Sequence, residues 1–215
     1  AITYHGDMDL SIIDEMPKNR IPVVTKVVEE GRLEKVYQFM KDEVSAGRQC
    51  MVVYPLVEET EKSDLIAAVE MHANLSKKIF SELKVGLIHG RMKKDEKDNV
   101  MDAYAKNEIH ILISTTVIEV GIDIPNATVM LIEHAERFGL TQLHQLRGRV
   151  GRGREKSYCI LVRRNFSDNS KKRLRIMEST NDGFIISDED LKIRGPGEFF
   201  GIRQSGFLKY KIADM

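Results

Sequence analysis

The sequence predicts an α/β doubly wound domain, with a largely parallel sheet covered by helices on both faces. Five short runs consist almost entirely of apolar residues, which is typical of strands buried on both faces. Segments with helical periodicity separate these runs at the spacing of β-α-β units. A chain of 215 residues is long enough to bury such a core.

The expected elements follow one another along most of the chain. Residues 1–24 contain Pro17 and Pro22 and are predicted to be a linker from something upstream. The predicted strands are residues 50–54, 85–88, 111–114, 129–132 and 158–162. The predicted helices are residues 33–45, 63–83 with Ser63 as the N-cap, and 93–105.

The pattern changes after about residue 165. A basic helix is predicted over 168–178, then a turn at 181–183, a short helix over 188–192 and a loop rich in glycine over 194–206. We therefore interpret residues 25–165 as one domain and residues 166–215 as a helical-hairpin and loop appendage.

Charge is segregated along a chain that is neutral as a whole. Residues 1–146 hold 17 basic and 24 acidic side chains, whereas residues 147–175 hold 11 basic side chains against only Glu155 and Asp168. The second block is expected to face an anion. For residues 171–175 alone, a solvated helix face is an equal alternative.

Composition excludes several classes of protein. No stretch approaches the ~18 consecutive apolar residues of a membrane span, and residues 1–20 carry no secretory signal, so a cytoplasmic location and no membrane partner are expected. Cys50 and Cys159 lie in apolar runs and are predicted to be inert core thiols. The six histidines lack the paired spacings of zinc sites, so no metal site is expected.

The strongest candidate for chemistry is QLRGRVGRG at residues 145–153. Arg149 and Arg152 are three residues apart at an expected helix end, and the glycines between and after them let backbone approach closely. Two guanidiniums placed in this way can hold one polyanion, because each fork bonds two oxygens. The alternative is a pair of surface arginines in ordinary ion pairs.

A second candidate is STTVIEVGIDIP at residues 114–125, directly after a predicted strand. Thr116 and Glu119 fit a capping box, and Gly121 would end the short helix and direct Asp123 back toward the carboxyl end of that strand. Helix-start amides bind phosphate and a carboxylate can accept a ribose hydroxyl. An ordinary cap followed by a terminating glycine is the alternative.

A third candidate is HGRM at residues 89–92, which lies between a predicted strand and a predicted helix. His89, Gly90 and Arg91 could contact phosphate there. A histidine at a strand end is more often a hydrogen-bonded structural residue.

Taken in order, YPLVEETE, HGRM, STTVIEVGIDIP and QLRGRVGR make the chain similar to the second RecA-like motor domain of superfamily 2 helicases. The segment GFIISDEDLKIRGPGEFFGIRQSG resembles the translocation motif shared by the RecG family and the transcription-repair coupling factors, and its RGPGE and QSG are closer to the RecG family. The resemblance implies the C-terminal motor part of an ATP-dependent DNA translocase that remodels stalled forks and Holliday junctions.

The resemblance also implies roles for individual residues. Arg149 and Arg152 correspond to arginine fingers on the γ-phosphate of ATP, which a first motor domain would hold with Mg²⁺. Gln145, Gly121 and Asp123 correspond to residues that contact the nucleotide.

Two further sets of residues follow from the same resemblance. The expected DNA contacts, on the backbone of branched duplex DNA, are Thr115, Thr116, His89, Gly90 and Arg91. The expected coupling residues, which would convert cleft closure into DNA movement, are Arg173, Arg194 and Gln204.

One departure from the family pattern limits these expectations. The sequence contains no G-x-x-x-x-G-K-[ST] loop and no acidic box, so these 215 residues alone are predicted to hydrolyse no ATP. Upstream motor and wedge domains of the same chain are the expected partners. The alternatives are the motor half of a coupling factor that acts on RNA polymerase, and a stand-alone nucleic-acid-binding module.

Overall fold

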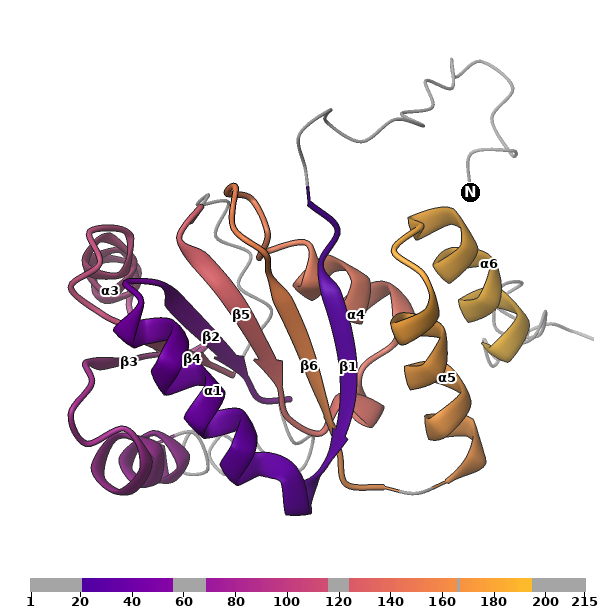
Figure 1. Cartoon of the computed structure of the whole chain (residues 1–215), viewed down its shortest axis with the longest axis horizontal. Coiled ribbons are helices and arrows are strands. Elements are labelled where there is room, and N and C mark those ends of the chain that lie inside the picture. The colour runs from indigo at the N-terminus through magenta and orange to yellow at the C-terminus, as the bar shows by residue number, and fades with distance from the viewer. Residues whose placement is uncertain (1–20, 56–68, 116–123, 166, 195–215) are drawn as a thin grey trace, which may run out of the picture.

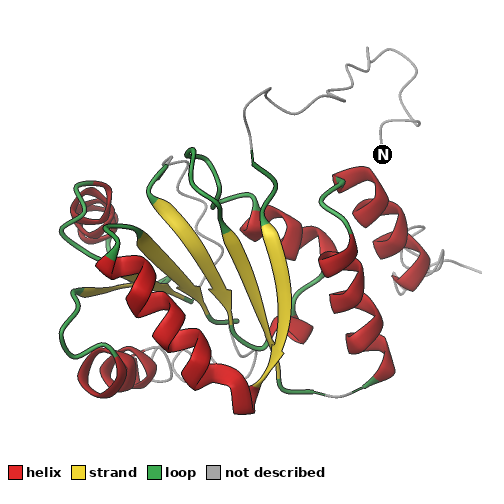
Figure 2. Cartoon of the chain, in the orientation of Figure 1, coloured by secondary structure: helices red, strands yellow, loops and turns green. Residues whose placement is uncertain are grey.

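The computed structural model describes residues 21–55, 69–115, 124–165 and 167–194. Within these ranges the chain forms a six-stranded sheet in the order β1-β6-β5-β2-β4-β3, and every neighbouring pair is parallel (Figures 1 and 2). The predicted α/β class is confirmed. The strands are β1 Val24–Glu29, β2 Gln49–Val53, β3 Val85–Ile88, β4 Ile111–Ser114, β5 Ala127–Ile132 and β6 Tyr158–Arg163.

The sequence prediction missed β1. This edge strand pairs with β6 from Val24↔Tyr158 to Glu29↔Arg163, so Val24 belongs to the sheet and not to a linker. Polar Thr25 and Lys26 interrupt its apolar run, and an edge strand needs fewer apolar side chains than a central one. On β1, the Val27 amide donates to the Glu178 Oε1 atom at 2.8 Å.

The helices at 33–45, 94–105 and 168–179 agree with the predicted ranges to within a residue, whereas no range was predicted for the helix at 140–147. The helices are α1 Leu33–Ser45, α3 Lys94–Ala105, α4 Leu140–Arg147, α5 Asp168–Ser179 and α6 Gly183–Arg194, with short turns at η2 Glu30–Arg32, η3 Leu75–Ile79 and η4 Ala135–Arg137. Residues 69–79 are the described part of the helix predicted over 63–83, and it ends four residues early. Helix α6 begins before the predicted residue 188, because the Asp182 side chain accepts from the amides of Phe184 and Ile185.

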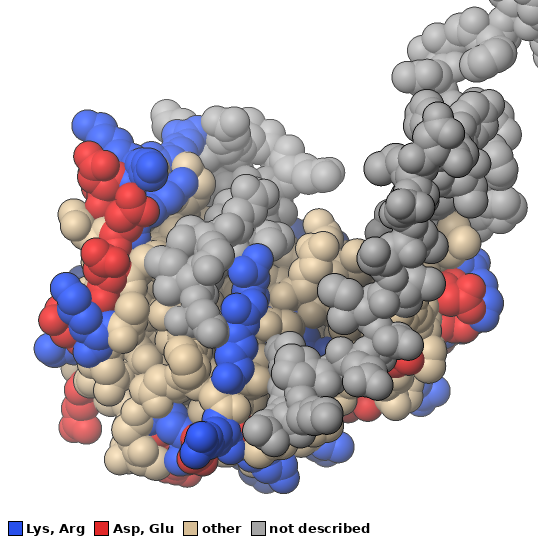
Figure 3. Space-filling model, turned by 90° about the horizontal axis from the view of Figure 1, so that it is seen from above, with Lys and Arg blue, Asp and Glu red and all other residues tan. Residues whose placement is uncertain are grey.

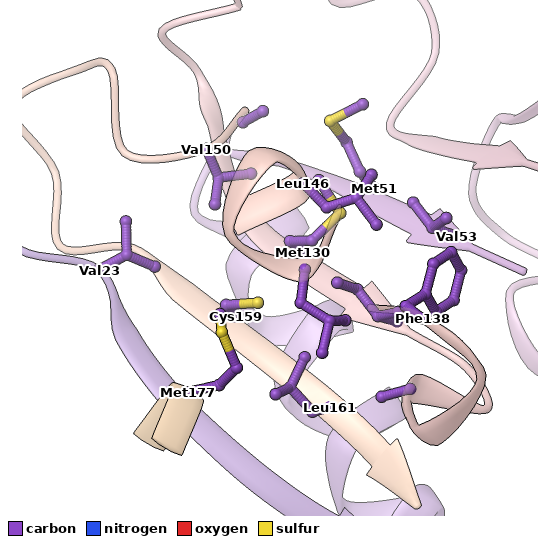
Figure 4. Close-up of a cluster of buried hydrophobic side chains, with 14 of the residues drawn as sticks. Val23, Met51, Val53, Met130, Phe138, Leu146, Val150, Cys159, Leu161 and Met177 are labelled. Carbon is purple, nitrogen blue, oxygen red and sulfur yellow. The ribbon is translucent and has the colours of Figure 1, made fainter. Parts of the chain in front are cut away.

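Two hydrophobic cores lie on opposite faces of the sheet. Alternate side chains of each central strand enter different cores: on β2, Met51 and Val53 enter one, whereas Cys50 and Val52 enter the other. The first core is closed by α3, α4, α5 and α6, and part of it is shown in Figure 4. The second is closed by α1 and η3. Helices therefore cover both faces, as predicted.

Both cysteines are buried, as expected for core thiols. Burial raises the pKa of Cys159 to about 12, which leaves its thiol protonated at neutral pH. Among the described residues, no group of three metal-ligating side chains is found. The same residues include no helix with the length and apolar character needed to span a bilayer.

Candidate functional site

The loop that carries Arg149 and Arg152 lies at the amino edge of the sheet. A Cβ atom added to Gly151 would lie 2.7 Å from Val23, and one added to Gly153 would lie 2.5 Å from the Pro125 carbonyl oxygen. Val23 immediately precedes β1, and Pro125 lies two residues before β5. The chain that follows α4 therefore crosses the amino ends of these strands.

Three features of the sequence give this loop its shape. Gly151 has φ +73°, in the left-handed region that glycine adopts without strain. At Gly153 the neighbouring atom is backbone, so a larger side chain would displace the loop. Val150 is fully buried in the first core, and Figure 4 shows it in the same cluster as Leu146 and Val23. The part of the loop between Arg149 and Arg152 is therefore held in place by the buried Val150 and by the glycines.

The arginines flank this buried valine. Arg149 is half-buried and, among the described residues, has no ion-pair partner. Arg152 is exposed, and its Nε atom donates to the Gly148 carbonyl at 3.2 Å. Gln145 is exposed one turn earlier on α4. The structure thus brings Gln145, Arg149 and Arg152 to one corner of the domain.

This position differs from the carboxyl edge of the sheet, where ligands of open α/β sheets usually bind. That rule concerns loops that follow strands, whereas Arg149 and Arg152 follow a helix. Helix α4 follows β5 and returns along the sheet, so its last turn lies where the strands begin. Figure 3 views this edge from above Figure 1 and shows basic (blue) atoms near its centre, with tan and grey atoms on either side.

The remaining nucleotide candidates, Gly121 and Asp123, lie outside the described residues. The residues on either side of them are informative. Thr115 follows the carboxyl end of β4, whereas Pro125 touches the Arg149–Gly153 loop at the amino edge. Thr115 and Pro125, described residues on either side of Gly121 and Asp123, therefore lie at opposite edges of the sheet.

The predicted DNA contacts lie at the carboxyl edge. His89 follows β3 and Thr115 follows β4, and the Thr115 amide donates to the Ile88 carbonyl at 3.2 Å. Gly90 and Arg91 are exposed on the turn after His89. Thr116 lies outside the described residues. His89, Gly90, Arg91 and Thr115 are therefore brought together, and they are separated from the arginine corner by the length of the strands.

His89 is the unusual member of this group. Its Nδ1 atom is buried and has no hydrogen-bond partner. Burial lowers the pKa of His89, and the positive charge of Lys97 lowers it further. The Lys97 Nζ atom also donates to the Gly90 carbonyl at 3.1 Å. A neutral imidazole thus lies next to cationic side chains, in a place where a phosphate oxygen would find donors.

The basic block at residues 147–175 does not act as one anion-binding surface, which corrects the expectation from the sequence. Arg147 is only 2% exposed, and its Nη1 atom donates to the carbonyls of Met177 and Thr180, each at 2.9 Å, and to the Thr25 hydroxyl at 3.2 Å. Burial lowers the pKa of Arg147. It joins α4 to β1 and to the end of α5, and its charge is balanced by the carbonyl end of α5.

Sequence reasoning missed this structural role, although a signal was present. Arg147 continues the helical spacing of Leu140 and Leu143, which face the first core. Its Nη2 atom lies 3.0 Å from His144 Nδ1. His144 Nε2 would lie 2.9 Å from a Cβ atom added to Gly183 at the start of α6.

Two more arginines of the block make contacts inside the domain. Arg163 pairs with Glu29 at 2.8 Å. Arg164 pairs with Glu30 and, at 3.2 Å, with the buried Glu133. These pairs join the carboxyl ends of β1, β5 and β6.

The predicted coupling residues are only partly described. The Arg173 Nη2 atom donates to the Glu136 carbonyl at 2.9 Å, which joins α5 to η4. Arg194 is the last residue of α6, but its side chain lies outside the description, as does all of Gln204. A further contact joins α4 to α6, because the Thr141 hydroxyl donates to Asp190 Oδ2 at 3.1 Å.

Comparisons with known proteins match both parts of the chain. Residues 31–154 match the family described as helicase conserved C-terminal domain, and residues 180–215 match the family described as ATP-dependent DNA helicase RecG, domain 3, C-terminal. Over its whole length the chain is 52% identical to the ATP-dependent DNA helicase RecG of Thermotoga maritima and 49% identical to that of Bacillus subtilis. It spans 28% and 32% of the length of these relatives.

Solved structures show the same fold. A structure of RecG bound to a three-way DNA junction matches with a TM-score of 0.78 and 49% identity, over 92% of this chain and 26% of that one. Domain 2 of the DEAD-box helicase Mss116p, solved with an RNA duplex, matches with a TM-score of 0.51 and 15% identity, over 77% of this chain and 72% of that one. At that identity the second match supports the fold alone.

Proposed function

Because the chain belongs to the helicase conserved C-terminal domain family, we propose that it is the second RecA-like motor domain of an ATP-dependent DNA helicase of the RecG type. The enzyme would remodel stalled replication forks and Holliday junctions in recombination and repair. The observation that carries the proposal is the separation of two sets of residues. Among the described residues, the candidate nucleotide contacts lie at the amino edge of the sheet, and the candidate DNA contacts lie at its carboxyl edge.

The amino edge is suited to the phosphates of ATP held by a facing first motor domain. Arg149 has no ion-pair partner among the described residues, and the pinned loop fixes its backbone relative to Arg152. In this role both guanidiniums would stabilise the charge that develops on the transferred phosphoryl group. Gln145 would contact the nucleotide or the facing domain. Gly121 and Asp123 complete the proposed nucleotide contacts, with Asp123 on the ribose.

Bound ATP would supply the phosphoryl group that is transferred to water, and Mg²⁺ would neutralise part of its negative charge. The residues of this chain fit one side of such a cleft only, because the sequence has no phosphate-binding loop and no acidic box for the metal. We therefore expect Mg²⁺ and most of the nucleotide to be held by the upstream motor domain.

The carboxyl edge is suited to the phosphodiester backbone. The turn over His89, Gly90 and Arg91 presents amide, imidazole and guanidinium groups, and Thr115 lies buried beside it on the neighbouring strand, with its amide bonded to the Ile88 carbonyl. Together with Thr116 they would hold phosphates without selecting bases. Binding should therefore be independent of sequence and should weaken as salt rises.

The hairpin of α5 and α6 is placed to respond to changes at the amino edge. Arg147 lies two residues before Arg149 and bonds to the end of α5, while Thr141 bonds to α6. A shift of α4 when the cleft closes would thus move the hairpin with it. Arg173, Arg194 and Gln204 would pass this movement to branched DNA, with residues 166–215 acting as one unit. We expect the enzyme to act in the cytoplasm.

The test is made on the full-length protein. Purified protein is mixed with a labelled Holliday junction or fork, Mg²⁺ and ATP, and both junction unwinding and phosphate release are measured. We expect unwinding that requires hydrolysable ATP, and ATP turnover that rises strongly when branched DNA is added. ATP turnover that does not change when DNA is added would contradict the proposal. Junctions that remain intact at saturating enzyme would contradict it as well.

A further inference from the structure

The exposed face of α5 carries a stripe of basic side chains that the proposed function does not use. Lys171, Lys172 and Arg175 are all exposed, and with Asp168, Ile176 and Ser179 they line a surface hollow. Arg175 is three residues after Lys172 and four after Lys171, so the three side chains lie near one another on one side of the helix. The opposite side, with Ser170, Leu174 and Met177, is buried.

These three cations differ from the other basic residues near them in the sequence. Arg147, Arg163, Arg164 and Arg173 each bond to groups inside the domain. Within the part of the chain that the structure describes, Lys171, Lys172 and Arg175 have no ion-pair partner. Among the residues that line the hollow, the acidic one is Asp168, which lies in the first turn of α5, where the helix dipole favours it.

We propose that this stripe, Lys171, Lys172 and Arg175, contacts the phosphodiester backbone of a duplex DNA arm. The inference rests on the proposed function and adds a second contact for the same substrate. The stripe has no aromatic side chain on which an unpaired base could stack, and stacking is the usual means of holding single strands. Its only apolar side chain in the hollow is Ile176, which offers little to a protein partner, because binding hot spots need large buried anchors.

The position of α5 makes this contact independent of the one at the carboxyl edge. Helix α5 packs on β1, at one end of the sheet, whereas His89 and Thr115 follow β3 and β4 at the other end. Five steps between neighbouring strands separate β1 from β3, or about 24 Å at the usual spacing. One helical turn of duplex DNA is longer, ~34 Å, so the two contacts would lie on separate phosphates of one arm or on two arms of a branched substrate.

The test compares two triple variants of the full-length protein. The first is Lys171→Gln, Lys172→Gln and Arg175→Gln. The matched control is Lys77→Gln, Lys78→Gln and Lys106→Gln, which removes three exposed cations elsewhere on the domain. Affinity for a blunt duplex, a fork and a single strand of equal length is measured over a range of salt concentrations.

We expect the α5 variant to weaken duplex and fork binding and to reduce the slope of log affinity against log salt by about 2–3, since each lost phosphate contact removes about 0.9. The control should keep the parental slope. The charge-conserving variant Lys171→Arg, Lys172→Arg, Arg175→Lys should also keep it. A slope equal to that of the control would overturn the inference, and so would an equal loss on the single strand.

The outcome is distinguishable from failure of the proposed function. If the protein is not a DNA-dependent ATPase, the ATP turnover of the unmodified enzyme will not change when DNA is added. The inference about α5 is decided by the salt slopes of the variants, which require no hydrolysis.

Discussion

The two edges of the sheet are built in different ways, although both carry residues proposed to contact phosphate. At the amino edge, Arg149 and Arg152 lie on a loop fixed by the buried Val150, by the left-handed Gly151 and by the close approach of Gly153 to Pro125. At the carboxyl edge, Gly90 and Arg91 lie on an exposed turn.

The difference matches the two tasks proposed for them. Stabilising charge in a transition state requires groups that are already in place, because reorganisation during the reaction reduces their effect. Holding and releasing a DNA strand at every step requires moderate contacts that can be broken. The comparison predicts that substitutions at the amino edge affect turnover, and that substitutions at the carboxyl edge affect DNA affinity.

The largest effect is expected for Arg149→Ala and Arg152→Ala in the full-length enzyme. The kcat for ATP should fall by at least ~10²-fold with little change in ATP affinity, because the guanidiniums act on charge that develops in the transition state. Steady-state kinetics at saturating DNA measures this. Arg154→Ala, a nearby exposed arginine, is the control. Near-normal turnover in both variants would remove the functional distinction between the edges. Lysine in place of either arginine should restore activity poorly, because an ammonium group cannot replace the planar guanidinium.

The next effect is on stability and concerns Arg147, which bonds to α5 and β1 close to the amino edge. Arg147→Ala leaves the carbonyls of Met177 and Thr180 and the Thr25 hydroxyl without their donor, so the free energy of unfolding should fall by roughly 2–4 kcal/mol. Denaturant titration of the 215-residue chain measures it. Arg154→Ala should stay within about 0.5 kcal/mol. An equally small change for Arg147→Ala would show that the bonds to α5 contribute little.

A smaller effect is expected at the carboxyl edge from Arg91→Ala. DNA affinity should fall several-fold and the salt slope should decrease by about 0.9, as for the loss of one phosphate contact. ATP turnover at saturating DNA should change by less than about twofold, since the residue lies at the other edge from the nucleotide corner. A fall in kcat as large as that of Arg149→Ala would contradict the division of tasks.

The smallest effect concerns the pH dependence introduced by His89. Burial and Lys97 lower its pKa in the folded state, so the unfolded chain takes up a proton first as pH falls. Its contribution to stability is complete above the unfolded pKa of about 6.5 and is lost as pH falls through the folded value. The denaturation midpoint of His89→Gln should therefore depend less on pH between about 7.5 and 5 than that of the parent. If the midpoints of His89→Gln and of the parent depend on pH equally, His89 does not titrate in this way.

The sequence by itself determined the elements that depend on local pattern. The central strands were predictable because runs such as residues 111–114 are apolar at every position but the last, and this is required where both faces are buried. Helix α1 was predicted to the residue. The Gly-Arg loop at 145–153 was recognisable because glycine is needed where backbone approaches backbone, as Gly153 approaches Pro125.

The tertiary structure alone decided which edge of the sheet each candidate residue occupies. It also decided which arginines are available to bind phosphate and which bond to groups inside the domain. Sequence spacing does not show that α4 returns along the sheet and places Arg149 at the amino ends of the strands. It also does not separate Arg147, which bonds to the end of α5, from Arg149 two residues later. The same charged group can be a buried structural donor or an exposed ligand for phosphate. Only the position of residues distant in the sequence, such as Thr25 and Met177, decides between these roles, because they supply the acceptors that replace water.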